Sequence, residues 1–107
     1  MSKSFRNMVA AMLMVGCAGA MSFAQSSAEV LYKSKCQMCH GEKGMADSGA
    51  GKSMKVKPVT DPDVKGMSEQ KMIDAVNDGM GKMQPFKGKL TDAQIKEVVA
   101  YFRTFSK

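Results

Sequence analysis

The sequence predicts an all-α domain of three to four short helices joined by long loops. Apolar residues recur at helical spacing near the C-terminus, and no stretch shows the apolar and polar alternation of a strand. A chain of 107 residues holds one small domain at most, and this one has no Trp and few large apolar side chains. Since small domains bury a modest share of their surface, we expect a bound cofactor to fill the centre.

The first 24 residues are expected to form a secretory signal peptide. A basic start with Lys3 and Arg6 precedes a short apolar run, and Ser22 and Ala24 give a small-x-small cleavage site. Cleavage there would leave residues 25–107 as the mature domain.

Two alternatives remain for this segment. The letters LMVGC, which end at Cys17, resemble the lipobox of bacterial lipoproteins, in which the Cys becomes the acylated first residue. The apolar run could also remain as an N-terminal anchor helix, although it is short and rich in Gly and Ala for a membrane span. Cleaved or lipidated, the polypeptide is exported, and Cys17 takes no part in a site within the domain.

The first expected helix leads into Cys36. Ser26 and Glu29 have the spacing of a capping box, and residues 28–35 continue at helical spacing. Residues 41–60 then shift to Gly, Ser, Lys and Asp, which predicts a loop with a turn of helix near residues 52–55. Pro58 and Pro62 are expected to keep this part irregular.

The next helix is predicted by "MSEQKMIDAVNDG", with Ser68 as N-cap and Gly79 as C-cap. Its apolar positions, Met72, Ile73 and Val76, fall on one face. A loop with three Gly and one Pro follows, "GMGKMQPFKGK".

The final helix carries the strongest periodic signal. Its apolar positions recur at i, i+3, i+4, i+7 and i+10, and they are Ile95, Val98, Val99, Phe102 and Phe105. Thr91 and Gln94 form a second capping-box pattern at its start.

The five residues "CQMCH", Cys36 to His40, carry the chemistry of the chain. A redox-active dithiol is one reading, but a thioredoxin-like frame needs strands, and none is predicted. Structural zinc takes four Cys or His ligands, and the mature chain offers only Cys36, Cys39 and His40. A blue-copper centre normally needs two His, and His40 is the only His.

Covalent haem fits this spacing. Two thiols separated by two residues can each add to one haem vinyl group, and the adjacent His40 can then ligate the iron. Haem iron in an electron carrier also takes a sixth ligand, and a Met thioether raises its potential.

Seven Met residues follow the signal segment, and most are expected to fill gaps in the core: Met38, Met45, Met54, Met67, Met72, Met80 and Met83. Met80 and Met83 differ from the others because both lie in the Gly/Pro loop before the last helix. Such a loop can bring a side chain to the haem from the side opposite His40. We therefore predict Met83 as the distal ligand, with Met80 as the alternative.

The chain resembles the small bacterial class I cytochromes c from about Ala28 to Phe105. The resemblance rests on "VLYKSKCQMCHG", "GKMQPFKGKL" and "VVAYFRTF". It implies a class I cytochrome c fold wrapped around one covalent haem c, with thioethers at Cys36 and Cys39. His40 would be the proximal ligand and Met83 the distal ligand of the iron.

The resemblance also implies that Tyr32 and Tyr101 lie on two helices that cross. Two departures stand out. Gln84 separates Met83 from Pro85, where relatives often have Met followed by Pro. Gly49 stands where relatives have a Pro whose carbonyl accepts the His Nδ1 proton, so another backbone carbonyl is expected to orient His40.

The function implied is that of a periplasmic one-electron carrier and not an enzyme, since no second His or spare Cys accompanies the haem site. Removing Lys3 and Arg6 leaves 14 basic against 10 acidic residues, a net charge of +4. The excess is nearly all Lys, which argues against a nucleic-acid groove and for an acidic partner. The residues expected near the haem crevice are Lys33, Lys35, Lys43, Lys52, Lys82, Lys87 and Lys89.

The partners implied are redox proteins: a quinol-oxidising complex, a terminal oxidase, a peroxidase or a periplasmic dehydrogenase. A membrane contact is expected only if Cys17 is lipidated. The competing function is a ligand-binding or peroxidatic haem protein, which would need Met83 to be absent from the iron or easily displaced from it; the altered "MQP" spacing favours it.

Overall fold

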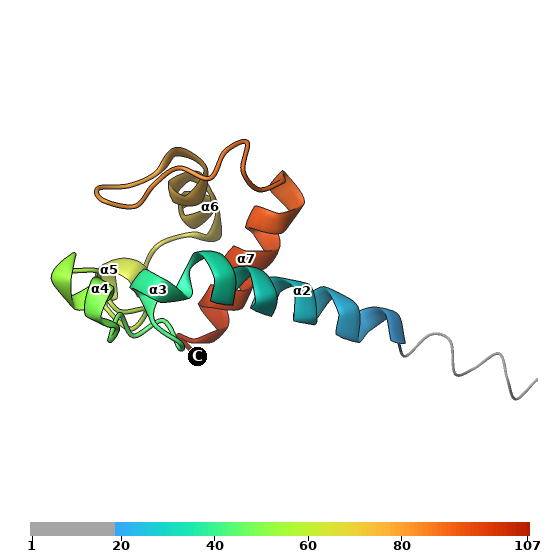
Figure 1. Ribbon diagram of the computed structural model, residues 1–107, viewed down its shortest axis with the longest axis horizontal. Helices are drawn as coiled ribbons and strands as arrows, with labels where there is room; N and C mark the ends of the chain where they lie inside the picture. Colours follow the sequence, from blue (N-terminus) through green and yellow to red (C-terminus); the bar gives the residue numbers. More distant parts are fainter. Residues whose placement is uncertain (1–18) are drawn as a thin grey trace, which may run out of the picture.

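The computed structural model describes residues 19–107, which contain six helices and no sheet (Figure 1). The helices are α2 (Gly19–Lys35), α3 (Gln37–His40), α4 (Gly49–Ser53), α5 (Pro62–Lys65), α6 (Glu69–Asp78) and α7 (Asp92–Thr104). The all-α prediction is confirmed, and the helices beyond the expected three or four are short ones of four or five residues. Cys17 and most of the predicted signal peptide lie outside the described residues.

The helix that leads into Cys36 is longer than the sequence predicts. α2 begins at Gly19 and runs through Ser26, so Ser26 is an interior residue and not an N-cap. No Pro lies between Gly19 and Cys36, so nothing there forces the helix to start later. No helix in the described part of the chain is long and apolar enough to cross a membrane.

The middle of the chain is more regular than predicted. α4 lies slightly before the expected turn at residues 52–55, because the Ser48 hydroxyl accepts a hydrogen bond from the Gly51 amide and starts the helix there. Pro62 opens α5 instead of preventing it. A Pro is tolerated in the first turn of a helix, where its missing amide proton has no partner to lose, and the Asp61 carboxylate caps this turn.

The boundaries of the last two helices are confirmed. The Ser68 hydroxyl accepts a hydrogen bond from the Lys71 amide at the start of α6, and Gly79 follows its last residue with a φ of 82°. At the start of α7, Thr91 and Gln94 form a reciprocal capping box.

The core is built around α7, which contacts both α2 and α6 (Figure 1). On the side of α6, Met72 and Ile73 pack against Ile95 and Val99. On the side of α2, Tyr32 lies 5.5 Å from Tyr101 between ring centroids, which confirms the expected crossing of these helices.

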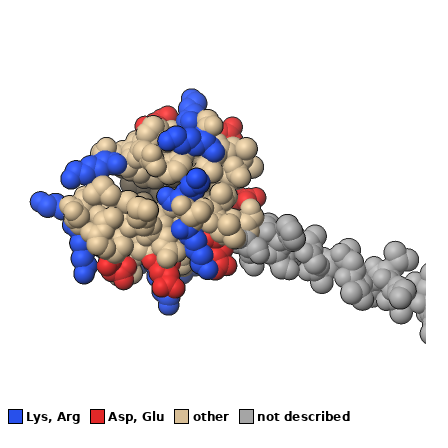
Figure 2. Space-filling model, viewed as in Figure 1, with Lys and Arg blue, Asp and Glu red and all other residues tan. Residues whose placement is uncertain are grey.

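The helices fall into two groups on either side of α7. Among the described residues, α3 contacts α2 and α4, whereas α6 contacts only α7. The two groups therefore do not pack on each other through helix contacts, and Figure 2 shows the surface hollowed between them.

Candidate functional site

Cys36, Cys39 and His40 lie on one turn of chain at the end of α2. The Cys36 amide donates to the Tyr32 carbonyl at 2.9 Å, so the residue that follows α2 is still bonded to its last turn. The His40 amide then donates to the Cys36 carbonyl at 3.0 Å, which closes the turn. Both thiols are free and half-buried. The structure therefore brings together three of the four predicted site residues.

The protonation of Cys36 bears on the dithiol alternative. Burial, with a smaller contribution from Cys39, raises the pKa of the Cys36 thiol to about 11. Redox-active cysteines have a lowered pKa because the thiolate is the reactive form. The surroundings of Cys36 do not favour a dithiol centre, and no group of three His, Cys, Asp or Glu residues in the described chain could hold a metal ion.

His40 is fixed mainly by packing. Its ring meets the edge of Phe102 with 5.3 Å between ring centroids. Its Nδ1 atom is buried and has no hydrogen-bond partner among the described residues. Burial lowers the pKa of the imidazole, which favours the neutral form that binds a metal. The expectation that a backbone carbonyl orients His40 through Nδ1 is therefore not met.

Tyr32 anchors the chain directly after His40. Its side chain is 1 % exposed, and its hydroxyl donates to the Gly41 carbonyl at 2.6 Å. Its ring also contacts Phe102 and Phe105 of the C-terminal segment. Because Gly41 has a φ of 84°, which a side chain would strain, the chain turns sharply here and leaves α3.

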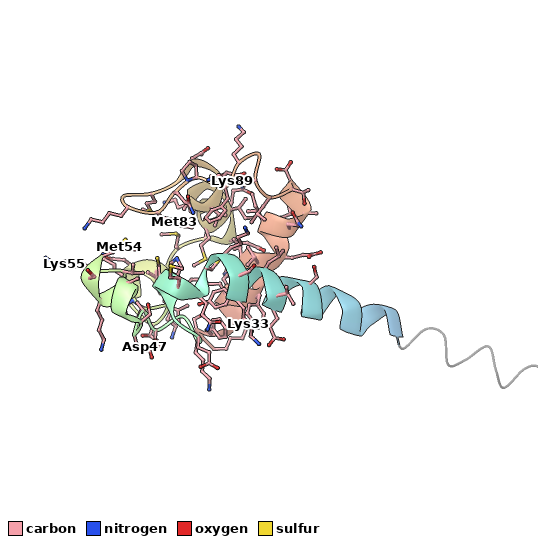
Figure 3. All side chains as sticks on the ribbon, in the orientation of Figure 1. Lys33, Asp47, Met54, Lys55, Met83 and Lys89 are labelled. Atoms are coloured by element: carbon pink, nitrogen blue, oxygen red, sulfur yellow. The ribbon has the colours of Figure 1, made fainter. Side chains whose placement is uncertain are left out.

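Met80 and Met83 face each other across a tight turn. The amide of each donates to the carbonyl of the other, at 3.2 Å from Met80 and 2.9 Å from Met83. Met80 is 61 % exposed, whereas Met83 is half-buried. Figure 3 shows Met83 extending from this loop toward the side where α3 and α4 lie.

The seven predicted lysines are all exposed. Lys33 forms an ion pair with Glu29 at 3.0 Å, and Lys89 donates to the Gln84 side chain at 3.3 Å. Figure 2 shows Lys and Arg side chains on both sides of the recess, while acidic side chains gather along the lower edge. This face can therefore present positive charge around the recess.

Comparison with known proteins shows to which class of protein the chain belongs. A solved structure described as "KustC0563 c-type cytochrome" is 30% identical, with a TM-score of 0.67, and the match covers 75% of this chain and 98% of that one. The chain is a monohaem c-type cytochrome domain, a class that carries covalent haem c with iron and transfers electrons without being an enzyme.

The particular family follows from a family model. The model described as "Cytochrome C oxidase, cbb3-type, subunit III" matches residues 23–102, and the chain belongs to this family. No curated protein matches the chain.

We call the turn from Cys36 to His40 the attachment turn. The residues in and around it fit a covalently bound haem. The two free thiols are half-buried on one turn, and Nδ1 of the imidazole beside them has no hydrogen-bond partner among the described residues. Sequence reasoning missed two contributors: Phe102, which it assigned only to the core, and Ser48, whose hydroxyl reaches the Met38 carbonyl at 2.6 Å. Ser48 lies three residues before Gly51, which is the spacing of an N-cap, so the sequence could have predicted the cap. It could not have predicted the contact of Ser48 with the Met38 carbonyl.

Replacing Tyr32 by Phe tests the anchor behind the turn. The variant removes the shorter of two hydrogen bonds to the Gly41 carbonyl and leaves the 3.4 Å bond from the Gly44 amide, so the free energy of unfolding should fall by about 1 kcal/mol. Tyr101→Phe is the matched control, because its hydroxyl makes no hydrogen bond with another described residue, and it should change stability little. Urea unfolding of the haem-loaded proteins measures both; equal losses would contradict the role of the Tyr32 hydroxyl.

The stability that the Tyr32 hydroxyl contributes through its bond to the Gly41 carbonyl should depend on pH. Burial raises the pKa of Tyr32 above its usual value, so its folded state prefers the protonated phenol. Its contribution is complete below pH ~10 and is lost as the pH rises from there toward the raised pKa. In urea unfolding at rising pH, the free energy of unfolding of Tyr32→Phe should not show this alkaline decrease.

Proposed function

We propose that this protein is a periplasmic one-electron carrier whose haem is attached through Cys36 and Cys39 and whose iron is ligated by His40 and Met83. The observation that carries the proposal is the single turn that holds both free thiols beside the only His of the chain. Membership in a c-type cytochrome family supports the assignment of these residues to haem attachment.

In this role the protein's residues would hold and shield the haem. The haem would supply one-electron exchange between ferric and ferrous iron. Thioethers at Cys36 and Cys39 would fix the haem to the turn that ends at His40, so that it would not dissociate between partners. The buried face of His40 against Phe102 limits the movement of the imidazole. Met83 would supply a second side-chain ligand to the iron, which would leave no position for a substrate and would favour electron transfer over catalysis.

Met83 is favoured over Met80 by its surroundings. The chain after Met83 is anchored because the Phe86 amide donates to the Val76 carbonyl at 2.8 Å and the Phe86 side chain is buried. On the other side, the hydrogen bonds with Met80 fix the start of the segment. Met83 is thus held between two anchors, whereas the Met80 side chain is mostly exposed.

The absorption spectrum tests the ligation. The ferric protein should show the weak far-red band of a Met–iron bond, and the ferrous protein should not bind carbon monoxide. Met83→Ala should lose the band and gain carbon monoxide binding, while Met80→Ala, a matched loss from the same turn, should keep the wild-type behaviour.

Other results would redirect the assignment. Loss of the band in Met80→Ala alone would make Met80 the ligand. A wild-type protein that lacks the band and binds carbon monoxide would support the peroxidatic or ligand-binding alternative, and absence of haem would overturn the proposal.

The partner proposed first is a terminal oxidase, as the family description suggests. The exposed lysines around the recess would steer the protein onto an acidic surface of that partner. The other redox partners, namely a quinol-oxidising complex, a peroxidase or a periplasmic dehydrogenase, would use the same charge.

Salt dependence tests this steering. The second-order rate of electron transfer to a purified cbb3-type oxidase should fall ~tenfold or more between low and high ionic strength. Charge removal at Lys82→Gln and Lys87→Gln should reduce the low-salt rate, whereas Lys96→Gln on α7, outside the predicted set, should change it little. Rates that do not change with salt would refute electrostatic docking.

The periplasmic location rests on the predicted export signal. Intact-mass measurement of the protein purified from a bacterial host should give a chain that begins at Gln25, plus one haem. A chain that begins at a diacylated Cys17 would instead indicate a lipid-anchored carrier, and an unprocessed chain retained in the cytoplasm would contradict export.

A further inference from the structure

Hydrogen bonds to its ends add to the packing that holds the short helix α3. α3 has four residues, none of them buried, and its unpaired backbone groups need partners outside the helix. The Gly41 amide donates to the Gln37 carbonyl at 2.9 Å, and the Ala46 amide donates to the His40 carbonyl at 2.8 Å. The carbonyl of Met38, between them, needs a donor from elsewhere.

Ser48 supplies that donor. Its hydroxyl donates to the Met38 carbonyl at 2.6 Å and accepts a hydrogen bond from the Gly51 amide at 3.0 Å. A hydroxyl has one proton to donate and lone pairs to accept, so both contacts can exist together. Ser48 therefore links the C-terminal end of α3 to the N-terminal end of α4.

Gly51 shows how closely α4 approaches this turn. A Cβ atom at Gly51 would lie 2.4 Å from the Cys39 carbonyl oxygen and 2.8 Å from that of Ala46. Only a residue without a side chain fits at these distances. The backbone of α4 thus lies directly against the residue that precedes His40.

His40 itself has no hydrogen bond at Nδ1 that could orient its ring. In metal sites this bond usually fixes the orientation of the ligand and tunes its basicity. Here the backbone of α3 and the edge of Phe102 remain to set the ring.

We propose that Ser48 is a positioning residue for the haem iron: by tying Met38 to Gly51, it sets the orientation of His40 and thereby the reduction potential. This inference rests on the proposed ligation by His40. Ser48 does not contact the iron ligand; it acts through the backbone of α3.

The experiment compares haem-loaded variants at Ser48. Ser48→Ala should shift the midpoint potential and the pattern of haem-methyl resonances in the NMR spectrum of the ferric protein, since those resonances report the orientation of the axial ligands. Ser48→Thr keeps the hydroxyl and should restore both values toward the wild type.

Ser68→Ala is the matched control. Ser68 caps α6 as Ser48 caps α4, with its hydroxyl accepting from the Lys71 amide at 3.2 Å, but α6 does not contact α3. Its loss should lower stability while leaving the potential and the haem-methyl pattern unchanged. A shift of equal size in both variants, or none in Ser48→Ala, would refute the positioning role.

Gly51→Ala provides a second route to the same element. The added methyl must push α4 away from the Cys39 carbonyl, so the same two quantities should shift although Ser48 is intact. If Ser48→Ala does not accumulate with haem, this variant and Ser48→Thr decide the question: wild-type values in Gly51→Ala refute the proposal, and a shift supports it.

The wild-type spectrum separates this test from the proposed function. If the wild-type protein lacks haem or the Met–iron band, the proposed ligation fails before any variant is compared. The wild-type spectrum can be as expected while the Ser48 and Gly51 variants keep the wild-type midpoint potential and haem-methyl pattern. In that case only the role of Ser48 is refuted.

Discussion

The structure depends on the hydrogen bond between the buried Tyr32 hydroxyl and the Gly41 carbonyl. This bond fixes the chain on both sides of the turn proposed to hold the haem, because Tyr32 lies one helical turn before Cys36 and Gly41 follows His40. The ring of Tyr32 carries that constraint into α7 through its contacts with Tyr101 and Phe102. A polar group this deeply buried is costly unless it is paired, so the pairing and the helix crossing stabilise each other.

The division of the molecule follows from α7. One face of this helix packs with α6 through Ile95 and Val99, and its aromatic end packs with α2. The attachment turn and α6 therefore approach a common space from different sides without helix contacts between them. A small chain with few large apolar side chains gains stability when it binds a large apolar group. The haem of a c-type cytochrome is such a group.

Sequence reasoning succeeded where a local rule determines the structure. The periodicity of residues 95–105 and the caps at Ser68, Gly79 and Thr91 are short-range signals, and the helices end where these signals indicate. It failed at Pro62, where a helix-breaking residue occupies the one position that tolerates it, and at Ser26, whose capping pattern lies within a continuing helix. The contact of Ser48 with Met38 joins residues ten positions apart and no local pattern encodes it. The same holds for the missing partner of His40 Nδ1, because only the packed structure shows which carbonyls are within reach.

The two proposed ligands are held in different ways, and Gln84, which follows Met83 where relatives often have Pro, shows why that matters. His40 lies on a turn bonded at several points, so a small change in that segment would move the imidazole directly. Met83 lies in a loop whose ends are fixed by the turn with Met80 and by the buried Phe86. Gln84 and Pro85 between them are exposed, and the carbonyl of Met83 lies close to Gly79, where a Cβ atom would come within 2.8 Å. The changed pair Gln84–Pro85 therefore lies at the surface, while Met83 and Phe86 keep their anchors. On this argument the departure from the Met-Pro pattern changes the outline of the loop and leaves the proposed Met ligation intact.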